Sequence, residues 1–143
     1  MNAMEISRTG LDVEWRRLET IAQNLANAGT TLDANGEPYR ALRLLSGPAG
    51  SFSDMVKPGK STDVLRGVTV YSIEAQALPP RRVYEPAHPQ ADAEGYVSYP
   101  GFDHAAEMAL MVKTSRAYEA NVVAMNAARQ MYSSAMEIGR RSA

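Results

Sequence analysis

Apolar residues recur with helical spacing at both ends of the chain. Near the N-terminus, one set falls seven residues apart and another lies on the same flank: Met4, Leu11, Leu18 and Leu25, then Trp15, Ile21 and Ala22. Near the C-terminus, steps of mostly three and four residues connect a longer set: Met108, Met111, Ser115, Tyr118, Val122, Met125, Tyr132 and Met136. Both spacings gather side chains along one side of a helix. They predict one helix from residue 7 to about 27 and another from about 104 to 139, with Asp103 as the N-cap of the second.

The segment between the two helices has the composition of short strands and loops. Residues 67–77 alternate in polarity and are rich in β-branched side chains, which predicts a strand. A shorter strand is expected at 39–45, and residues 82–84 are expected to pair with residues 95–99. Residues 46–66 contain several Gly, Pro and Ser residues, which predicts a mobile surface loop.

Together these elements predict a mainly α fold with a small β insert. Residues 1–32 supply an N-terminal helix, residues 33–102 a middle segment of strands and loops, and residues 103–143 a long C-terminal helix. The length of 143 residues suits a single domain, and the hydrophobic content of 45% is sufficient for a core.

The longer helix carries a second line of apolar residues, again seven apart: Leu110, Ala117, Ala124, Met131 and Ile138. The shorter helix cannot cover all of the longer one, because the two lengths differ by more than ~10 Å at ~1.5 Å per residue. Leaving a few hundred Å² of this surface in water forgoes several kcal/mol at roughly 25 cal/mol per Å². We therefore expect other subunits to cover the line. In the alternative, the middle segment folds back over it.

Charge and cysteine content narrow the function. The chain has 15 basic and 16 acidic residues and a net charge of -1, which gives no electrostatic reason to expect nucleic-acid binding. It contains no cysteine, which excludes disulfides, thiolate nucleophiles and Cys-ligated metals. No apolar run approaches the ~20 residues needed to span a bilayer. The N-terminus lacks the pattern of a cleaved signal peptide, so export would leave it intact.

Three motifs in this order resemble those of the bacterial flagellar rod and hook family. The first is residues 18–28 (LETIAQNLANA). The second is residues 84–89 (YEPAHP) followed by 91–97 (ADAEGYV), which resembles one member of the proximal rod. The third is Glu107-Met108 followed by residues 115–122 (SRAYEANV). The sequence departs from the family at residues 101–103, where Gly-Phe-Asp replaces an Asn-Val-Asp-like step, and in a longer segment at 46–66.

The resemblance implies a fold, an assembly and a location. The terminal helices would pair as an antiparallel, coiled-coil-like inner α-domain, and many copies would stack helically into a shaft that transmits torque. The expected partners are further copies and the rod proteins FlgB, FlgF, FlgG and FliE. The flagellar type III export apparatus would deliver the chain, without signal cleavage, to the periplasmic rod of the basal body.

The candidate site residues are those expected at the assembly interface: Leu11, Trp15, Leu18, Ile21, Asn24, Leu25, Tyr118, Asn121, Val122, Met125, Arg129, Tyr132 and Met136. A polar residue beside an apolar seam can set its register, so Asn24 is interpreted as a donor or acceptor to a neighbouring subunit. Asn121 has the same two interpretations, local or intersubunit bonding. Arg129 either extends to solvent or pairs with a neighbour's carboxylate.

Catalytic and cofactor chemistry have little support. His104 and Glu107 have a spacing that can share a metal, with Asp103 beside them, but acidic residues at a helix N-terminus explain the pattern more simply. We predict no catalytic residue, metal or cofactor. The chain is interpreted as a non-enzymatic structural subunit of the flagellar rod, and the alternative is a soluble helical-hairpin adaptor or chaperone-like module.

Overall fold

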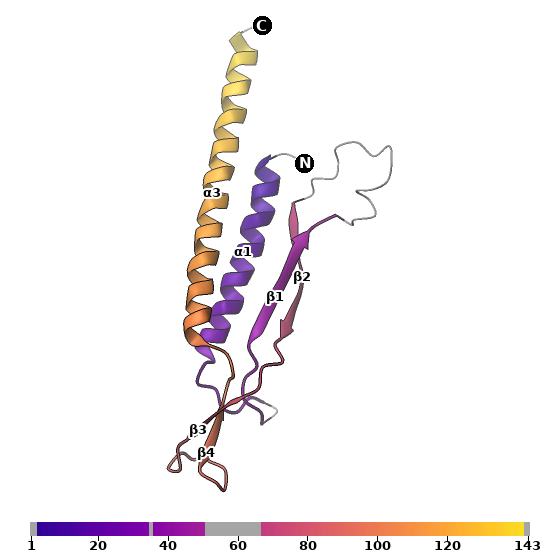
Figure 1. Ribbon diagram of the computed structural model, residues 1–143. Coiled ribbons are helices and arrows are strands. Elements are labelled where there is room, and N and C mark those ends of the chain that lie inside the picture. Colours follow the sequence, from indigo (N-terminus) through magenta and orange to yellow (C-terminus); the bar gives the residue numbers. More distant parts are fainter. Residues whose placement is uncertain (1–2, 35, 51–66, 142–143) are drawn as a thin grey trace.

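The computed structural model describes residues 3–34, 36–50 and 67–141. In chain order the elements are α1 (Ala3–Ala26), β1 (Leu42–Pro48), β2 (Val68–Ala75), β3 (Arg81–Tyr84), β4 (Tyr96–Tyr99) and α3 (His104–Arg141). Figure 1 shows two long helices beside a β1–β2 hairpin, with the small β3–β4 hairpin at one end of an elongated molecule. The predicted mainly α fold with a small β insert is confirmed.

The helix ends follow local hydrogen bonding. At the end of α1, the Asn27 side chain donates to Gln23 O at 2.8 Å and accepts from the Thr30 hydroxyl at 3.1 Å. At the start of α3, Ala105 N donates to Asp103 Oδ1 at 2.9 Å, so the predicted N-cap is confirmed. The predicted start of α1, at residue 7, is four residues too late: the helix begins at Ala3, and its first turn holds the helix formers Ala3, Met4 and Glu5.

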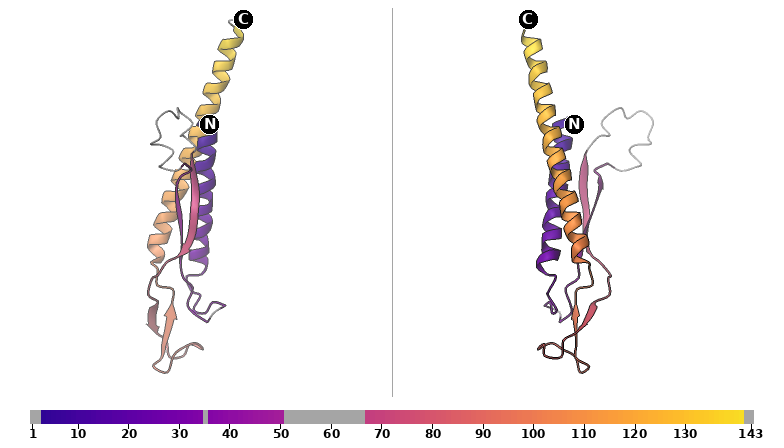
Figure 2. Two further views of the ribbon diagram at one scale, coloured as in Figure 1. Left: turned by 90° about the vertical axis from the view of Figure 1, so that its right-hand side faces the viewer. Right: turned by 60° about the vertical axis from the view of Figure 1, so that its left-hand side comes forward.

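Helix α1 lies between α3 on one side and the β1–β2 hairpin on the other (Figures 1 and 2). The two helices run antiparallel. Among the described elements, β1 and β2 pack along α1 and not along α3. The described part of the middle segment therefore does not fold over the second apolar line of α3, contrary to the alternative, and Met131 and Ile138 remain 66% and 69% exposed.

Strand β1 begins and ends three residues later than predicted. Residues 46–48, expected in a loop, pair with Val68, Thr69 and Val70, and a bulge separates Leu45 from Ser46. A glycine allows this pairing: a Cβ on Gly47 would lie 2.6 Å from the hydroxyl oxygen of Tyr71, which donates to Pro48 O at 2.7 Å. The rest of the expected loop, residues 51–66, lies outside the described residues.

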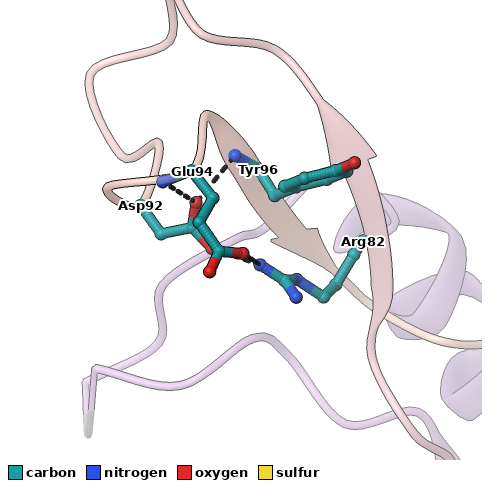
Figure 3. Close-up of polar contacts among 4 residues, drawn as sticks. All are labelled: Arg82, Asp92, Glu94 and Tyr96. Atoms are coloured by element: carbon teal, nitrogen blue, oxygen red, sulfur yellow. Dashed lines mark hydrogen bonds and ion pairs between the residues drawn. The ribbon is translucent and has the colours of Figure 1, made fainter.

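The β3–β4 hairpin confirms the predicted pairing of residues 82–84 with 95–99. Asp92 closes its loop by accepting from Tyr96 N at 2.8 Å and Glu94 N at 3.0 Å (Figure 3). Arg82 pairs with Asp92 and Glu94 and lies over the Tyr96 ring at 4.7 Å. These backbone donors, together with Arg82, hold the pKa of Asp92 below its usual value. The loop is thus tied by its own side chains.

The buried apolar core formed by the described residues is small. It comprises Val13, Ile21, Ala41, Leu44, Val97 and Ala128. Several large apolar side chains are instead more than half exposed in the single subunit, among them Trp15, Val123, Met131, Tyr132 and Ile138. Neither described helix combines the length and apolar character that crossing a membrane requires.

Candidate assembly site: the paired terminal helices

Two contacts show how α1 and α3 align. Gly10 faces Asn121, since a Cβ on Gly10 would lie 2.7 Å from Asn121 Oδ1. Asn24 donates to Glu107 Oε2 at 3.1 Å. The two contacts are two heptads apart on each helix, as a single antiparallel register requires. On α1, the residues of closest contact, Gly10 and Asn24, each precede a leucine of the predicted seven-residue apolar repeat. The members of that repeat are half-buried: Met4, Leu11, Leu18 and Leu25.

Small and polar side chains form the closest part of this seam. On α3, Glu107, Thr114 and Ala128 are buried and Asn121 is half-buried, and these four residues fall seven apart. The missing side chain of Gly10 lets the backbone of α1 approach Asn121 closely. A search for apolar residues cannot find a contact line made of small and polar side chains. The seven-residue spacing of these four residues could have indicated that they share one side of α3.

Asn24 joins three segments of the subunit. Its side chain is fully buried. The Nδ2 group donates to Leu42 O at 2.9 Å and to Glu107, and Oδ1 accepts from Leu42 N at 2.7 Å and Tyr39 OH at 3.0 Å. Both amide protons and both lone pairs of oxygen are used inside the chain. The intersubunit hydrogen bond expected of Asn24 is therefore replaced by intrachain bonds.

The hydrogen bonds around Asn24 include the Tyr39 hydroxyl, so we expect the folded subunit to lose stability at alkaline pH. Burial raises the pKa of the Tyr39 hydroxyl above 10.0, and the nearby Glu107 carboxylate raises it further. The folded state thus favours the neutral phenol, and its contribution is present below about pH 10 and lost as pH rises through the higher folded pKa. Urea unfolding of the chain should show stability falling above pH 10, with a shallower fall in Tyr39→Phe. Equal slopes in the two proteins would contradict this assignment.

Helix α3 continues well beyond the N-terminal end of α1 (Figure 1). It has 38 residues against 24 in α1, or about 57 Å against about 36 Å. We call residues 129–140 the overhang, and every one of them is exposed. Met131, Tyr132, Met136 and Ile138 are its large apolar residues, with 55–69% of each exposed. Arg129 is exposed at its base, and an ion pair with a neighbour stays a prediction.

The remaining predicted residues divide by exposure. Ile21 is buried, and the half-buried ones are Leu11, Leu18, Leu25, Tyr118, Asn121, Val122 and Met125. Asn121 donates to Ala117 O at 3.0 Å, as expected if its side chain bonds locally within the helix. Trp15 is 56% exposed, with its ring 6.3 Å from that of Tyr118. Exposed and half-buried members can contact a neighbour, whereas buried ones serve the subunit itself.

The residues considered for a metal have other partners. Asp103 caps α3, and Glu107 is buried against Asn24. In the described part of the chain, no three His, Asp or Glu residues gather as metal ligands would.

Known proteins resemble this chain over nearly its whole length. A family described as flagellar basal body rod FlgEFG protein, C-terminal, matches residues 93–138. The FlgC protein of Salmonella typhimurium is 34% identical over 98% of both chains, and that of Escherichia coli O157:H7 is 36% identical over the same shares. The FlgC protein of Bacillus subtilis is 37% identical over 97% of both chains. Each of the three is named a flagellar basal-body rod protein.

Proposed function

The chain belongs to the FlgC family of flagellar basal-body rod proteins and is a structural subunit of the rod, and from this premise we propose that it assembles through apolar surface that its paired helices leave exposed. The observation that carries this proposal is the overhang. Fully burying one large apolar side chain contributes about 1.5–3 kcal/mol. A neighbour that covered the four such residues of the overhang would thus gain several kcal/mol.

The shape of the subunit supports an open assembly. The overhang lies at one end of the molecule and the β3–β4 hairpin at the other (Figures 1 and 2). A contact between two different surfaces, repeated without closing, builds a helical array. Residues 1–32 and 103–143 then form the inner α-domain of a shaft that transmits torque. We propose Trp15, Arg129, Tyr132 and Met136 as direct contacts with neighbours.

The same reasoning extends to partners and location. As a component of the basal body, the chain associates with other rod components. We propose FlgB, FlgF, FlgG and FliE as neighbours in the proximal rod, and the periplasm as the compartment. The small core supports export by the flagellar type III apparatus, because a chain with few buried apolar side chains unfolds at low cost for passage through a narrow channel.

Sedimentation of the purified chain at rising concentration tests the open mode of assembly. We expect the average mass to keep growing, because each added subunit presents a new overhang. A helical-hairpin adaptor that forms a closed dimer would saturate at twice the monomer mass. Saturation at that mass would contradict the open array while leaving family membership intact.

A further inference from the structure

The seam between α1 and α3 repeats every seven residues, so its small side chains do not define one alignment. In the observed alignment Asn121 lies opposite Gly10. If one helix slides by seven residues, Thr114 or Ala128 lies opposite Gly10 instead, depending on the direction of the slide. Both replacements are small enough to lie near a glycine. Such a slip moves one helix by about 10 Å. Flat, repetitive seams of this kind are prone to slip unless a specific contact prevents it.

One contact distinguishes the observed alignment. Asn24 is fully buried and is held from one side by Leu42 and Tyr39, so its position relative to the start of β1 is fixed. Its remaining amide proton points to Glu107, which is itself only 5% exposed. We propose that the Asn24–Glu107 hydrogen bond is a register lock, which positions α3 against α1. A buried polar pair acts in this way when other alignments leave it unsatisfied.

Both neighbouring alignments break this bond. If α3 slides toward its C-terminal end by seven residues, Glu107 faces Arg17 instead of Asn24. Arg17 is already held by both carboxylate oxygens of Glu14 at 2.7 Å and by Ser46 Oγ at 2.7 Å. If α3 slides the other way, Asn24 faces Thr114 and Glu107 passes the end of α1. The observed register alone satisfies Asn24 and Glu107 together.

The register also sets how much of α3 extends beyond α1. A slip of one heptad lengthens or shortens the overhang by about two turns of helix, since a turn holds about 3.6 residues. Given the proposed function, the lock thereby fixes the surface offered to the next subunit. The lock itself is a property of the single chain and is tested without assembly.

Disulfide trapping measures the register directly, because the chain has no cysteine of its own. Gly10→Cys with Asn121→Cys reports the observed alignment. Gly10→Cys with Thr114→Cys, and with Ala128→Cys, report the two slipped ones, since a disulfide requires Cβ atoms about 3.5–4.5 Å apart. Each pair is placed in three full-length backgrounds: unchanged, Glu107→Gln and Glu107→Met. Oxidation rates are measured in a glutathione buffer, and helix content is followed by circular dichroism.

We expect the observed-register pair to oxidise at least tenfold faster than either slipped pair in the unchanged chain and in Glu107→Gln, which keeps an acceptor oxygen. In Glu107→Met, which has similar length and only a weakly accepting sulfur in place of the oxygens, at least one slipped pair should oxidise at least tenfold faster than it does in the unchanged chain. An unchanged preference in Glu107→Met would overturn the proposal. So would a loss of helix in that variant, which would show that Glu107 supports stability rather than register. Neither result would alter the assignment of the chain to the rod.

Discussion

Replacing Tyr132 and Met136 together by Glu is expected to abolish rod assembly while leaving the fold of the subunit intact. Both side chains lie on the overhang, 60% and 55% exposed, so the subunit loses no buried contact. Exposed substitutions of this kind change the free energy of unfolding by about 0.5 kcal/mol or less. In an assembled rod the two carboxylates would be desolvated against apolar neighbours, at a cost of several kcal/mol for each ion. Because about 1.4 kcal/mol is a factor of ten, assembly should fall at least roughly a hundredfold.

The measurements are the amount of this chain in purified basal bodies and the spreading of cells in soft agar. The matched control is Gln130→Glu with Ser133→Glu, which adds the same two charges on the side of the helix that carries Glu137. Urea unfolding of both variants separates folding from assembly. Normal rods from the Tyr132 and Met136 variant would show that the overhang is not an interface. Equal loss in the control would indicate a general effect of charge.

Periodicity predicted the two helices and strand β2 because that signal is local. The seven-residue repeat of apolar residues marks a helix wherever its partner lies, and Asp103 caps α3 through a bond to a residue two positions away. The pairing of residues 82–84 with residues 95–99 also has a local basis, since Asp92 closes the loop between them by accepting from backbone donors two and four residues away. For each of these elements, nearby residues determine the conformation.

The alignment of the helices could not be predicted, because the residues that define it are far apart and not apolar. Asn24 and Glu107 are separated by 83 positions, and each has a local explanation: an Asn near a helix end, an acid in a first turn. Gly10 gave no apolar signal, and in the structure its missing side chain permits close approach to Asn121. The apolar repeat thus indicated that α1 and α3 each pack against a partner, but not which side of each helix lies closest to the other helix.

This division also explains why the predicted site residues do not act as one set. The apolar pattern marks every side chain that avoids water, without regard to which chain covers it. In the structure Ile21 is covered by its own subunit, whereas Tyr132 and Met136 stay exposed. Substituting a buried member disturbs folding before assembly can be examined. Only the exposed members test the interface directly.

Replacing Asn24 by Leu is expected to remove a large fraction of the stability of the isolated subunit. Leu has a similar volume, so the change deletes hydrogen bonds and leaves little cavity. The Leu42 N–H and C=O groups, the Tyr39 hydroxyl and the Glu107 carboxylate all lose a partner. An unsatisfied buried polar group costs about 1–3 kcal/mol, and a buried network broken from one side costs on the order of 3–5 kcal/mol in total. Against a total stability of about 5–15 kcal/mol for a domain, this is a large fraction.

Asn27→Leu is the matched control for this prediction, since it makes the same chemical change three residues later in the same motif. Asn27 is half-buried, and among the described residues its side chain bonds only to Gln23 and Thr30, so the loss of these side-chain bonds should cost about 0.5–1.5 kcal/mol. Urea unfolding followed by circular dichroism gives both values. Equal losses would mean that the junction of α1, β1 and α3 is no more important than an ordinary helix end. A much larger loss for Asn24 would show that the three segments are held together by this one buried amide.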